Sequence, residues 1–464
     1  MAGQTDSLTP RTGWRGILTG PQGGLTIGLT LLTLSVATES LVITAIMPAI
    51  VRDIGGVSLY GFAFSAFFLA GLASIPIAGW GVDRFGPSVP FAATISVFLI
   101  ATSIAALSPN MPLLVAARAA QGLGAAAQFT ISQSTIARAY PLEARVRVLS
   151  LMSATWVLPG LLGPSIGAGI ATLFGWRWAF GAILVPAILA AAITYPRLRG
   201  VGGSAASPRR PAVRRPIQVA VGVGLFISGL TSLSWWSIGL TLAGLALAIE
   251  ALIHLLPAGT MRAAPGLPAI VAASFFLNVG FYAASSFVPL VLVGVRGVSV
   301  VAAGFALASA TLAWTVGVCL NTQLVDRYPR GLLVAGFALL LAMCIAGFAT
   351  AIYGAPLPFA YAAWTVSGLG MGICFNTLTL NAMAAAASGG EGFALAGRNL
   401  TANLGTAFGT GVGGAAVAAS QAASLGLKPG LAATFGLAAA AALITGALAG
   451  RTMPSSDRTY DAAR

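Results

Sequence analysis

Long apolar stretches, separated by short polar connections, constrain this chain more than any other sequence feature. A helix needs about 20 apolar residues to cross the hydrocarbon core of a bilayer. Fourteen stretches meet that length closely enough to be candidate spans: residues 25–50, 58–80, 88–107, 111–135, 148–172, 178–195, 217–233, 237–256, 268–293, 299–320, 331–352, 356–384, 397–420 and 430–450. The pattern therefore predicts an all-α membrane protein.

Composition excludes several other classes of protein. Of the 464 residues, 57% are hydrophobic and only 7% are charged, whereas soluble domains carry about 25% charged residues. The chain has one histidine and three cysteines, Cys319, Cys344 and Cys374, without metal-ligand spacing. These counts argue against a soluble enzyme, a disulfide scaffold, a metal site and a catalytic triad. We expect no enzyme activity and no cofactor.

The placement of the basic residues predicts the topology. If the N-terminus is cytoplasmic, nineteen basic residues fall on the cytoplasmic side, Arg398 among them, and only Arg52, Arg177, Arg296 and Lys428 fall outside. This bias follows the positive-inside rule. It predicts fourteen spans with both termini in the cytoplasm, and it assigns the net charge of +14 to the lipid surface rather than to nucleic acid. A twelve-span variant, with residues 217–256 lying partly on the membrane surface, is the alternative.

The spans group as six, two and six. We expect a six-helix bundle in residues 1–195, a cytoplasmic linker with two extra transmembrane helices in residues 196–267, and a second six-helix bundle in residues 268–464. The four residues from Val82 to Phe85 and the four from Val325 to Tyr328 repeat one pattern after the second span of each bundle. Repeated halves are typical of secondary transporters.

Two charged residues lie well inside predicted spans. Glu39 is near the middle of the first span, and Arg118 lies in the fourth. An intramembrane charge is expensive, so each should face protein or water. We expect Glu39 to couple proton movement to transport and to pair with Arg118, directly or through water. The alternatives are a carboxyl that only packs helices and an arginine that only ties its helix to neighbouring backbone.

Four motifs carry a resemblance to a known family. They are Gly79–Gly86, Arg118–Ala125, Gly160–Ala168 and Glu39–Pro48. In order and position they resemble the major facilitator superfamily, and most closely its fourteen-helix drug:proton antiporter branch. The sequence departs from the usual pattern in having Ala168 in place of the last glycine of the third motif.

The resemblance implies a set of conformational switch residues. Gly79, Asp83, Arg84 and Gly86 would latch the outward-facing state, with Asp326 and Arg327 as the pseudo-symmetric copy. Gly160, Gly163, Pro164 and Gly167 would thin and kink one helix, which would form a bendable seam between the halves. The alternative for the charged residues is a topology signal combined with a turn.

Polar and aromatic residues within the spans are candidates for a substrate cavity. They are Gln121, Gln128, Asn278, Tyr282, Trp314, Trp364, Asn376, Asn399 and Asn403. Amides in apolar helices can also simply bond a neighbouring helix, which is the alternative. As a set they predict a large apolar cavity that takes lipophilic molecules, and Glu39 would favour cations.

Together these features predict a proton-coupled antiporter that exports lipophilic or cationic small molecules by alternating access. Its partners would be the substrate, protons and the bilayer, and we expect a monomer in a bacterial cytoplasmic membrane. Two alternatives remain: an exporter of an endogenous metabolite or lipid, and a non-transporting membrane receptor or scaffold on the same fold.

Overall fold

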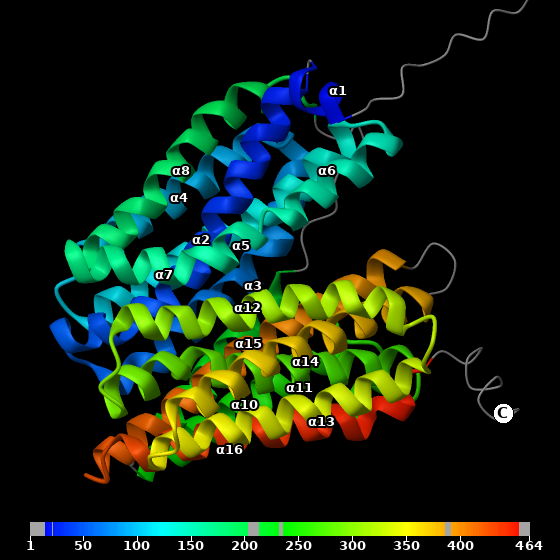
Figure 1. Ribbon diagram of the computed structural model, residues 1–464. Helices are drawn as coiled ribbons and strands as arrows, with labels where there is room; N and C mark the ends of the chain where they lie inside the picture. The colour runs from blue at the N-terminus through cyan, green and yellow to red at the C-terminus, as the bar shows by residue number, and fades with distance from the viewer. Residues whose placement is uncertain (1–13, 21, 203–212, 232–234, 386–390, 454–464) are drawn as a thin grey trace, which may run out of the picture.

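The computed structural model describes residues 14–453, except residues 21, 203–212, 232–234 and 386–390 (Figure 1). Arg11, Arg209, Arg210, Arg458 and Arg464, which the sequence analysis counted as cytoplasmic, lie outside the described residues. All regular structure in the described part is helical.

Helices of the first half lie where the sequence predicts its first six spans. They are α1 (Trp14–Thr19), α2 (Gly23–Ile54), α3 (Tyr60–Phe85), α4 (Ser88–Ala106), α5 (Met111–Ala139), α6 (Leu142–Ala154), α7 (Val157–Leu173) and α8 (Trp176–Leu198). Local chemistry fixes several ends. Asn110 caps α5 by accepting a hydrogen bond from the Leu113 N–H at 3.0 Å, and Gly55 ends α2 with a φ of 71°.

The predicted span 148–172 lies within one candidate membrane span, Arg147–Leu173, which is built from two helices. A turn at Thr155 and Trp156 separates α6 from α7. Pro159 lies in the first turn of α7, where its missing N–H leaves no helical bond unmade. A hydropathy pattern does not register such a break because the residues on both sides are apolar.

Two helices follow the first half, and one of them, α9, contacts both halves. They are α9 (Arg214–Thr231) and α10 (Trp235–Leu255), which pack side by side. α9 also packs against α3 of the first half and α15 of the second. Buried Ile227 of α9 touches Gly411 of α15, and Phe226 stacks on Phe408 with ring centroids 5.6 Å apart. We call this pair the α9–α10 hairpin.

The second half lies where the sequence predicts its last six spans. Its helices are α11 (Leu267–Pro289), α12 (Val300–Leu324), α13 (Arg330–Ala349), α14 (Leu357–Ala384), α15 (Glu391–Ala422) and α16 (Leu427–Leu448), and α11 continues as a π-helical turn over Leu290–Val295. Short 3-10 turns cover Val57–Leu59, Thr260–Arg262, Thr350–Tyr353 and Ala449–Arg451.

Eleven helical segments among the described residues are long and apolar enough to cross a membrane. α5, α9 and α15 fall outside that set, and these helices carry Arg118, Arg214 with Arg215, and Arg398. Large apolar side chains cover the outward faces; Leu173, Leu242 and Met343 are each more than 60% exposed. Such a surface needs lipid around it. The protein is therefore a multi-pass membrane protein of the all-α class.

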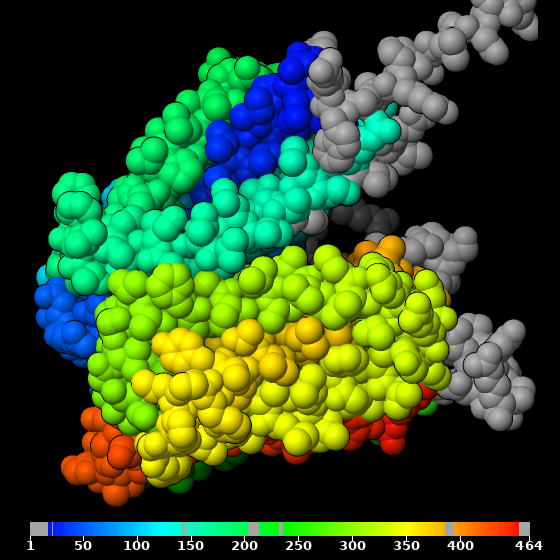
Figure 2. Space-filling model, viewed as in Figure 1, coloured from blue at the N-terminus to red at the C-terminus, as the bar shows by residue number. Residues whose placement is uncertain are grey.

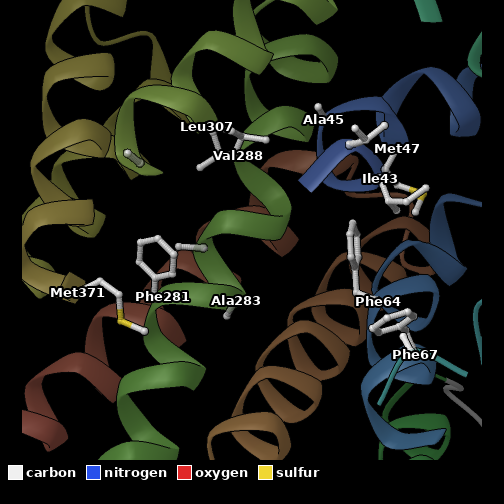
Figure 3. Packing of buried hydrophobic residues seen from close by; sticks show 14 of the residues in the cluster. Ile43, Ala45, Met47, Phe64, Phe67, Phe281, Ala283, Val288, Leu307 and Met371 are labelled. Atoms are coloured by element: carbon white, nitrogen blue, oxygen red, sulfur yellow. The ribbon is translucent and has the colours of Figure 1, made fainter. Parts of the chain in front are cut away.

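The two halves meet along two seams, α3 against α15 and α7 against α12. At one end of the molecule the Tyr60 hydroxyl of α3 donates to the Ser286 carbonyl of α11 at 2.9 Å. Figure 3 shows apolar side chains of α2 and α3, such as Met47 and Phe64, in the cluster that also contains Val288 of α11. At the opposite end, where α1 and α6 lie, the space-filling view shows a notch between the halves (Figure 2). The halves are thus closed at one end and diverge at the other.

Candidate functional site

A buried ion pair occupies the first half. The Glu39 carboxylate of α2 and the Arg118 guanidinium of α5 are in direct contact, and their side chains are 0% and 3% exposed. A buried charge is tolerated only when an opposite charge and hydrogen bonds replace the lost water. The structure therefore brings together the two charged residues that the sequence singles out within the spans.

Further contacts hold Arg118 in place. Its Nε donates to the Ala63 carbonyl of α3 at 3.0 Å, and its Nη1 donates to Gln121 Oε1 at 3.1 Å. The guanidinium carbon lies 4.4 Å from the centre of the Phe67 ring, so a cation–π contact covers one face. Gln121 Nε2 in turn donates to Thr102 of α4 at 2.9 Å. Helices α2, α3 and α5 thus contact the guanidinium directly, and α4 is linked to it through Gln121.

The two predicted cavity glutamines are both fully buried in this conformer. Gln121 belongs to the ion-pair network. Gln128 Nε2 donates to the Thr94 carbonyl of α4 at 3.3 Å, so this side chain lies between α4 and α5. The structure places both amides within the helix packing of the first half.

Aromatic side chains gather in the second half. Trp364 is fully buried and stacks on Phe281 with a centroid distance of 5.5 Å. Trp314 contacts Phe281 edge-on at 5.3 Å and Phe375 at 5.5 Å. Trp314, Phe375 and Tyr282 are only partly buried, so one side of this cluster remains accessible.

The predicted cavity asparagines differ in their surroundings. Asn278 donates to the Ser274 carbonyl of its own helix at 2.8 Å, and Asn376 donates to Asn321 at 2.7 Å. Asn399 is exposed and accepts from Arg398 at 3.2 Å. Asn403 is partly buried. The four amides do not form one group.

Arg398 itself is a buried charge that the sequence analysis assigned to the cytoplasmic surface. The structure places it in α15 with 1% exposure, and its Nη2 donates to the Phe375 carbonyl of α14 at 3.0 Å. The signal was present in the sequence because the predicted span 397–420 already includes this residue. Counting it as a topology charge was wrong.

The motif after the second span forms an ion pair with α5. Arg138 Nη2 of α5 lies 2.5 Å from an Asp83 carboxylate oxygen of α3. The Arg84 guanidinium carbon lies 5.5 Å from the centre of the Trp80 ring. Gly86 ends α3 with a φ of 73°, a conformation that favours glycine. Gly79 lies one turn before Asp83, where a Cβ atom would meet open space.

The second copy of that motif is built differently. Asp326 and Arg327 are both exposed, in a turn after α12. Neither has an ion-pair partner among the residues that the structure describes. The repeat in sequence is therefore not a repeat of the Asp83–Arg138 contact.

The glycines of α7 face two neighbours rather than one. A Cβ atom at Gly160 would collide with Thr311 of α12, while one at Gly167 would lie 2.6 Å from Val42 of α2. Gly163 also faces α2, and the Pro164 carbonyl lies against Gly304 of α12. Gly160 and Pro164 thus form the contact between halves, and the other two glycines pack α7 within its own half.

Two cavities lie beside α2, one at its C-terminal end and one along its length. One of about 250 Å³ lies near the closed end, between the end of α2 and the π-helical turn after α11; its lining includes Pro48, Val57, Leu290, Val293 and Gln421. The other, of about 210 Å³, lies between α2, α7 and α8 and is almost entirely apolar.

Comparison with known families decides which kind of protein this is. Residues 29–410 match the family model described as Major Facilitator Superfamily. The chain belongs to that superfamily. It is therefore a membrane transporter of the major facilitator type and not an enzyme.

Relatives within the superfamily carry names that refer to efflux. A Mycobacterium tuberculosis protein named a multidrug-efflux transporter is 28% identical, and the alignment covers 88% of this chain and 90% of that protein. The Bacillus subtilis Multidrug transporter protein MdtP is 25% identical over 77% of this chain and 68% of its own.

Solved structures of other major facilitator proteins share the fold. A D-xylose-proton symporter matches with a TM-score of 0.68 and 17% identity, covering 93% of this chain and 98% of that one. A bacterial homologue of the human lysosomal transporter Spinster, in an inward-facing and occupied conformation, matches with a TM-score of 0.64 and 19% identity, over 92% and 96% of the two chains. At these identities the likeness concerns the fold alone.

Proposed function

We propose that this protein is a proton-coupled antiporter that exports lipophilic small molecules by alternating access. It would have fourteen spans, both termini in the cytoplasm and its place in a bacterial cytoplasmic membrane. The buried Glu39–Arg118 pair carries the proposal, because a structural helix has no need of two charges in hydrocarbon. The names of the relatives support efflux of drugs as the task.

The ion pair can convert protonation into a conformational change. When a proton neutralises Glu39, Arg118 loses its counter-charge but remains buried. An uncompensated buried charge raises the energy of this conformer, so the equilibrium shifts toward one in which Arg118 finds water or another partner. Releasing the proton on the other side restores the pair. Proton binding and the orientation of the site are coupled in this way.

Two other contacts would distinguish the conformers. Asp83 with Arg138 joins α3 to α5 at the end where the halves diverge, and Gly160 with Thr311 joins α7 to α12. The half-exposed Asp83–Arg138 pair is a weak contact on its own. We assign the first contact to a latch within the first half, and the second to a seam that must slide when the halves rock.

The ion pair also bears on which substrates fit. A free carboxylate at Glu39 would favour cationic substrates. In the structure that carboxylate contacts Arg118, and the pair is neutral as a unit. The proposal therefore concerns lipophilic molecules without a preference for positive charge.

Proton flux in proteoliposomes tests the proposal. Vesicles would contain the pH dye pyranine and receive ethidium, N-phenyl-1-naphthylamine or 1-naphthylacetate, with empty vesicles as the blank. We expect at least one probe to cause a proton flux with wild type, and Glu39→Gln to reduce it to the blank. Asp53→Asn is the matched control, because Asp53 is an exposed carboxylate that pairs with Arg177 at 2.7 Å. If Glu39→Gln retains the flux, Glu39 is not the coupling group.

A further inference from the structure

Arg398 differs from the other arginine buried inside the bundles. Arg118 has the Glu39 carboxylate beside it, whereas Arg398 has no carboxylate partner among the described residues, although it is 1% exposed. A guanidinium remains charged at any physiological pH. The second half therefore contains a buried positive charge that no acidic side chain described in the structure neutralises.

The guanidinium has unused donors. Arginine has five N–H groups. Nη2 donates to the Phe375 carbonyl at 3.0 Å and Nη1 to the Asn399 side chain at 3.2 Å, while the buried Nε atom has no partner. An unsatisfied buried donor on a charged group is costly, and a carboxylate that binds two of its N–H groups would remove that cost.

An exposed residue covers the guanidinium. Asn399 is exposed on the surface of α15, and its side-chain oxygen accepts from Arg398. The acceptor in this hydrogen bond is a neutral amide oxygen on an exposed side chain. An anionic group could displace it and would bind more strongly, because a carboxylate adds the attraction of opposite charges and can accept two parallel N–H bonds from one guanidinium.

Arg398 also lies beside the accessible edge of the aromatic cluster. Its guanidinium carbon is 4.0 Å from the centre of the Phe375 ring, and that ring contacts Trp314. Both rings are partly buried. Arg398 lies seven residues into α15, about 10 Å along the helix axis, and α15 begins at the end of the molecule where the notch opens (Figures 1 and 2). A charged group and a flat apolar surface are thus adjacent on the open side.

Four other acidic residues are paired elsewhere, and exposed Asp326 has no ion-pair partner among the described residues. Glu39 is paired with Arg118, Asp53 with Arg177, Asp83 with Arg138 and Glu250 with Arg215. We propose that Arg398 binds the carboxylate of an aromatic amphipathic substrate, which displaces Asn399 and stacks against Phe375 and Trp314. This substrate class rests on the proposed export function and defines its cargo as a lipophilic anion.

Binding of three molecules that share one ring system tests the site. The probes are 1-naphthylacetate, its neutral amide and the cationic 1-naphthylmethylammonium, titrated by calorimetry into the purified full chain in detergent. We expect wild type to bind the acid more tightly than the amide and the amide more tightly than the cation. Arg398→Gln should weaken acid binding by about 10- to 100-fold and leave amide binding unchanged, as expected for losing a charged hydrogen bond.

Two variants and one control sharpen the test. Arg398→Lys keeps the charge but not the paired donors, so its affinity for the acid should lie between those of wild type and Arg398→Gln. Asn399→Ala removes the competing acceptor and should tighten acid binding. Arg199→Gln is the matched control, since Arg199 is exposed and stacks on Tyr195 at 4.7 Å; it should change neither affinity.

Several results would overturn the proposal. Equal binding of acid and amide by wild type would do so even if Arg398→Gln failed to fold, and so would unchanged acid binding in a folded Arg398→Gln. The export function fails separately: Arg398-dependent acid binding without any substrate-driven proton flux would refute the antiporter but keep the site. Substrate-driven proton flux without tighter binding of the acid than of the amide would refute the Arg398 site but keep the antiporter.

Discussion

Two buried arginines set the chemistry of the protein at the scale of single residues. Arg118 is surrounded by a carboxylate, a carbonyl, an amide and a ring, so its charge is balanced within the first half. Arg398 has a carbonyl, an amide and a ring, but no carboxylate from the described residues. The difference between the two sites is one negative charge, and we assign that charge to the substrate.

The buried pair predicts a non-additive effect on stability. Glu39→Gln leaves Arg118 buried without its counter-charge and should lower the free energy of unfolding by about 3–5 kcal/mol. The double variant Glu39→Gln/Arg118→Gln removes both charges and should be more stable than the single variant. Thermal unfolding in detergent measures both. A double variant less stable than Glu39→Gln alone would show that the two side chains do not depend on each other.

The sequence predicted some of these residues and not others for a physical reason. Charged residues within apolar spans are rare, so a carboxylate there has few possible partners. The Glu39–Arg118 pair could therefore be predicted from the sequence. An amide has many possible partners, and which one it meets depends on the rotation of its helix. The hydrogen-bond partners of Gln128, Asn278 and Asn376 therefore could not be predicted from the sequence.

At the scale of helices, the seams between the halves are positions where two helix backbones approach each other closely. At the closed end Gly61 of α3 faces Gly414 of α15, and a Cβ atom on Gly61 would lie 2.5 Å from the Gly414 Cα. Neither helix can accept a side chain there without moving. The seam between α3 and α15 thus depends on two glycines that belong to none of the four sequence motifs. The α7 glycines, which do belong to a motif, lie elsewhere.

A side chain at Gly61 should open the closed end. Gly61→Val forces α3 and α15 apart, and overpacking of this kind typically costs ~1–3 kcal/mol, so the open population should rise by about tenfold. Maleimide labelling of a cysteine placed at buried Ser286, in a chain with Cys319, Cys344 and Cys374 replaced, reports the opening.

A matched glycine provides the control for that labelling. Gly169 of α7 has open space where its Cβ would lie, so Gly169→Val should leave the labelling rate unchanged. An equal rate in both variants would show that the glycine contact does not hold the end closed.

The whole molecule is two bundles joined by the α9–α10 hairpin. Nine residues form a second apolar cluster that draws from α3, α9, α10 and α15: Leu69, Leu72, Val219, Val223, Ile227, Ala248, Ala251, Leu404 and Ala407. The hairpin therefore packs on both halves where they meet at the α3–α15 seam. Hydropathy predicted the order and position of the helices well, because the length of an apolar run is set by the bilayer. It could not predict which helices touch, since lipid and protein neighbours are equally apolar.

Loss of packing under the hairpin should destabilise the whole chain. Ile227→Ala removes a fully buried side chain that touches Gly411, and it should lower the free energy of unfolding by about 2–5 kcal/mol. Ile238→Ala on α10 is the matched control, because Ile238 is 65% exposed. Thermal unfolding of both variants gives the comparison, and equal losses would mean that the hairpin does not brace the seam.

The hairpin covers only one of the two seams. On the other, exposed side chains of α7 such as Ile166 and of α12 such as Phe305 lie on the outer surface, and α2 of the first half is the described helix that packs on both α7 and α12. A solute dissolved among the acyl chains diffuses in two dimensions around the protein. The α9–α10 hairpin separates it from the α3–α15 seam, whereas the outer side of the α7–α12 seam is exposed to lipid. We therefore expect a solute to pass between the lipid and the interior on the α7–α12 side.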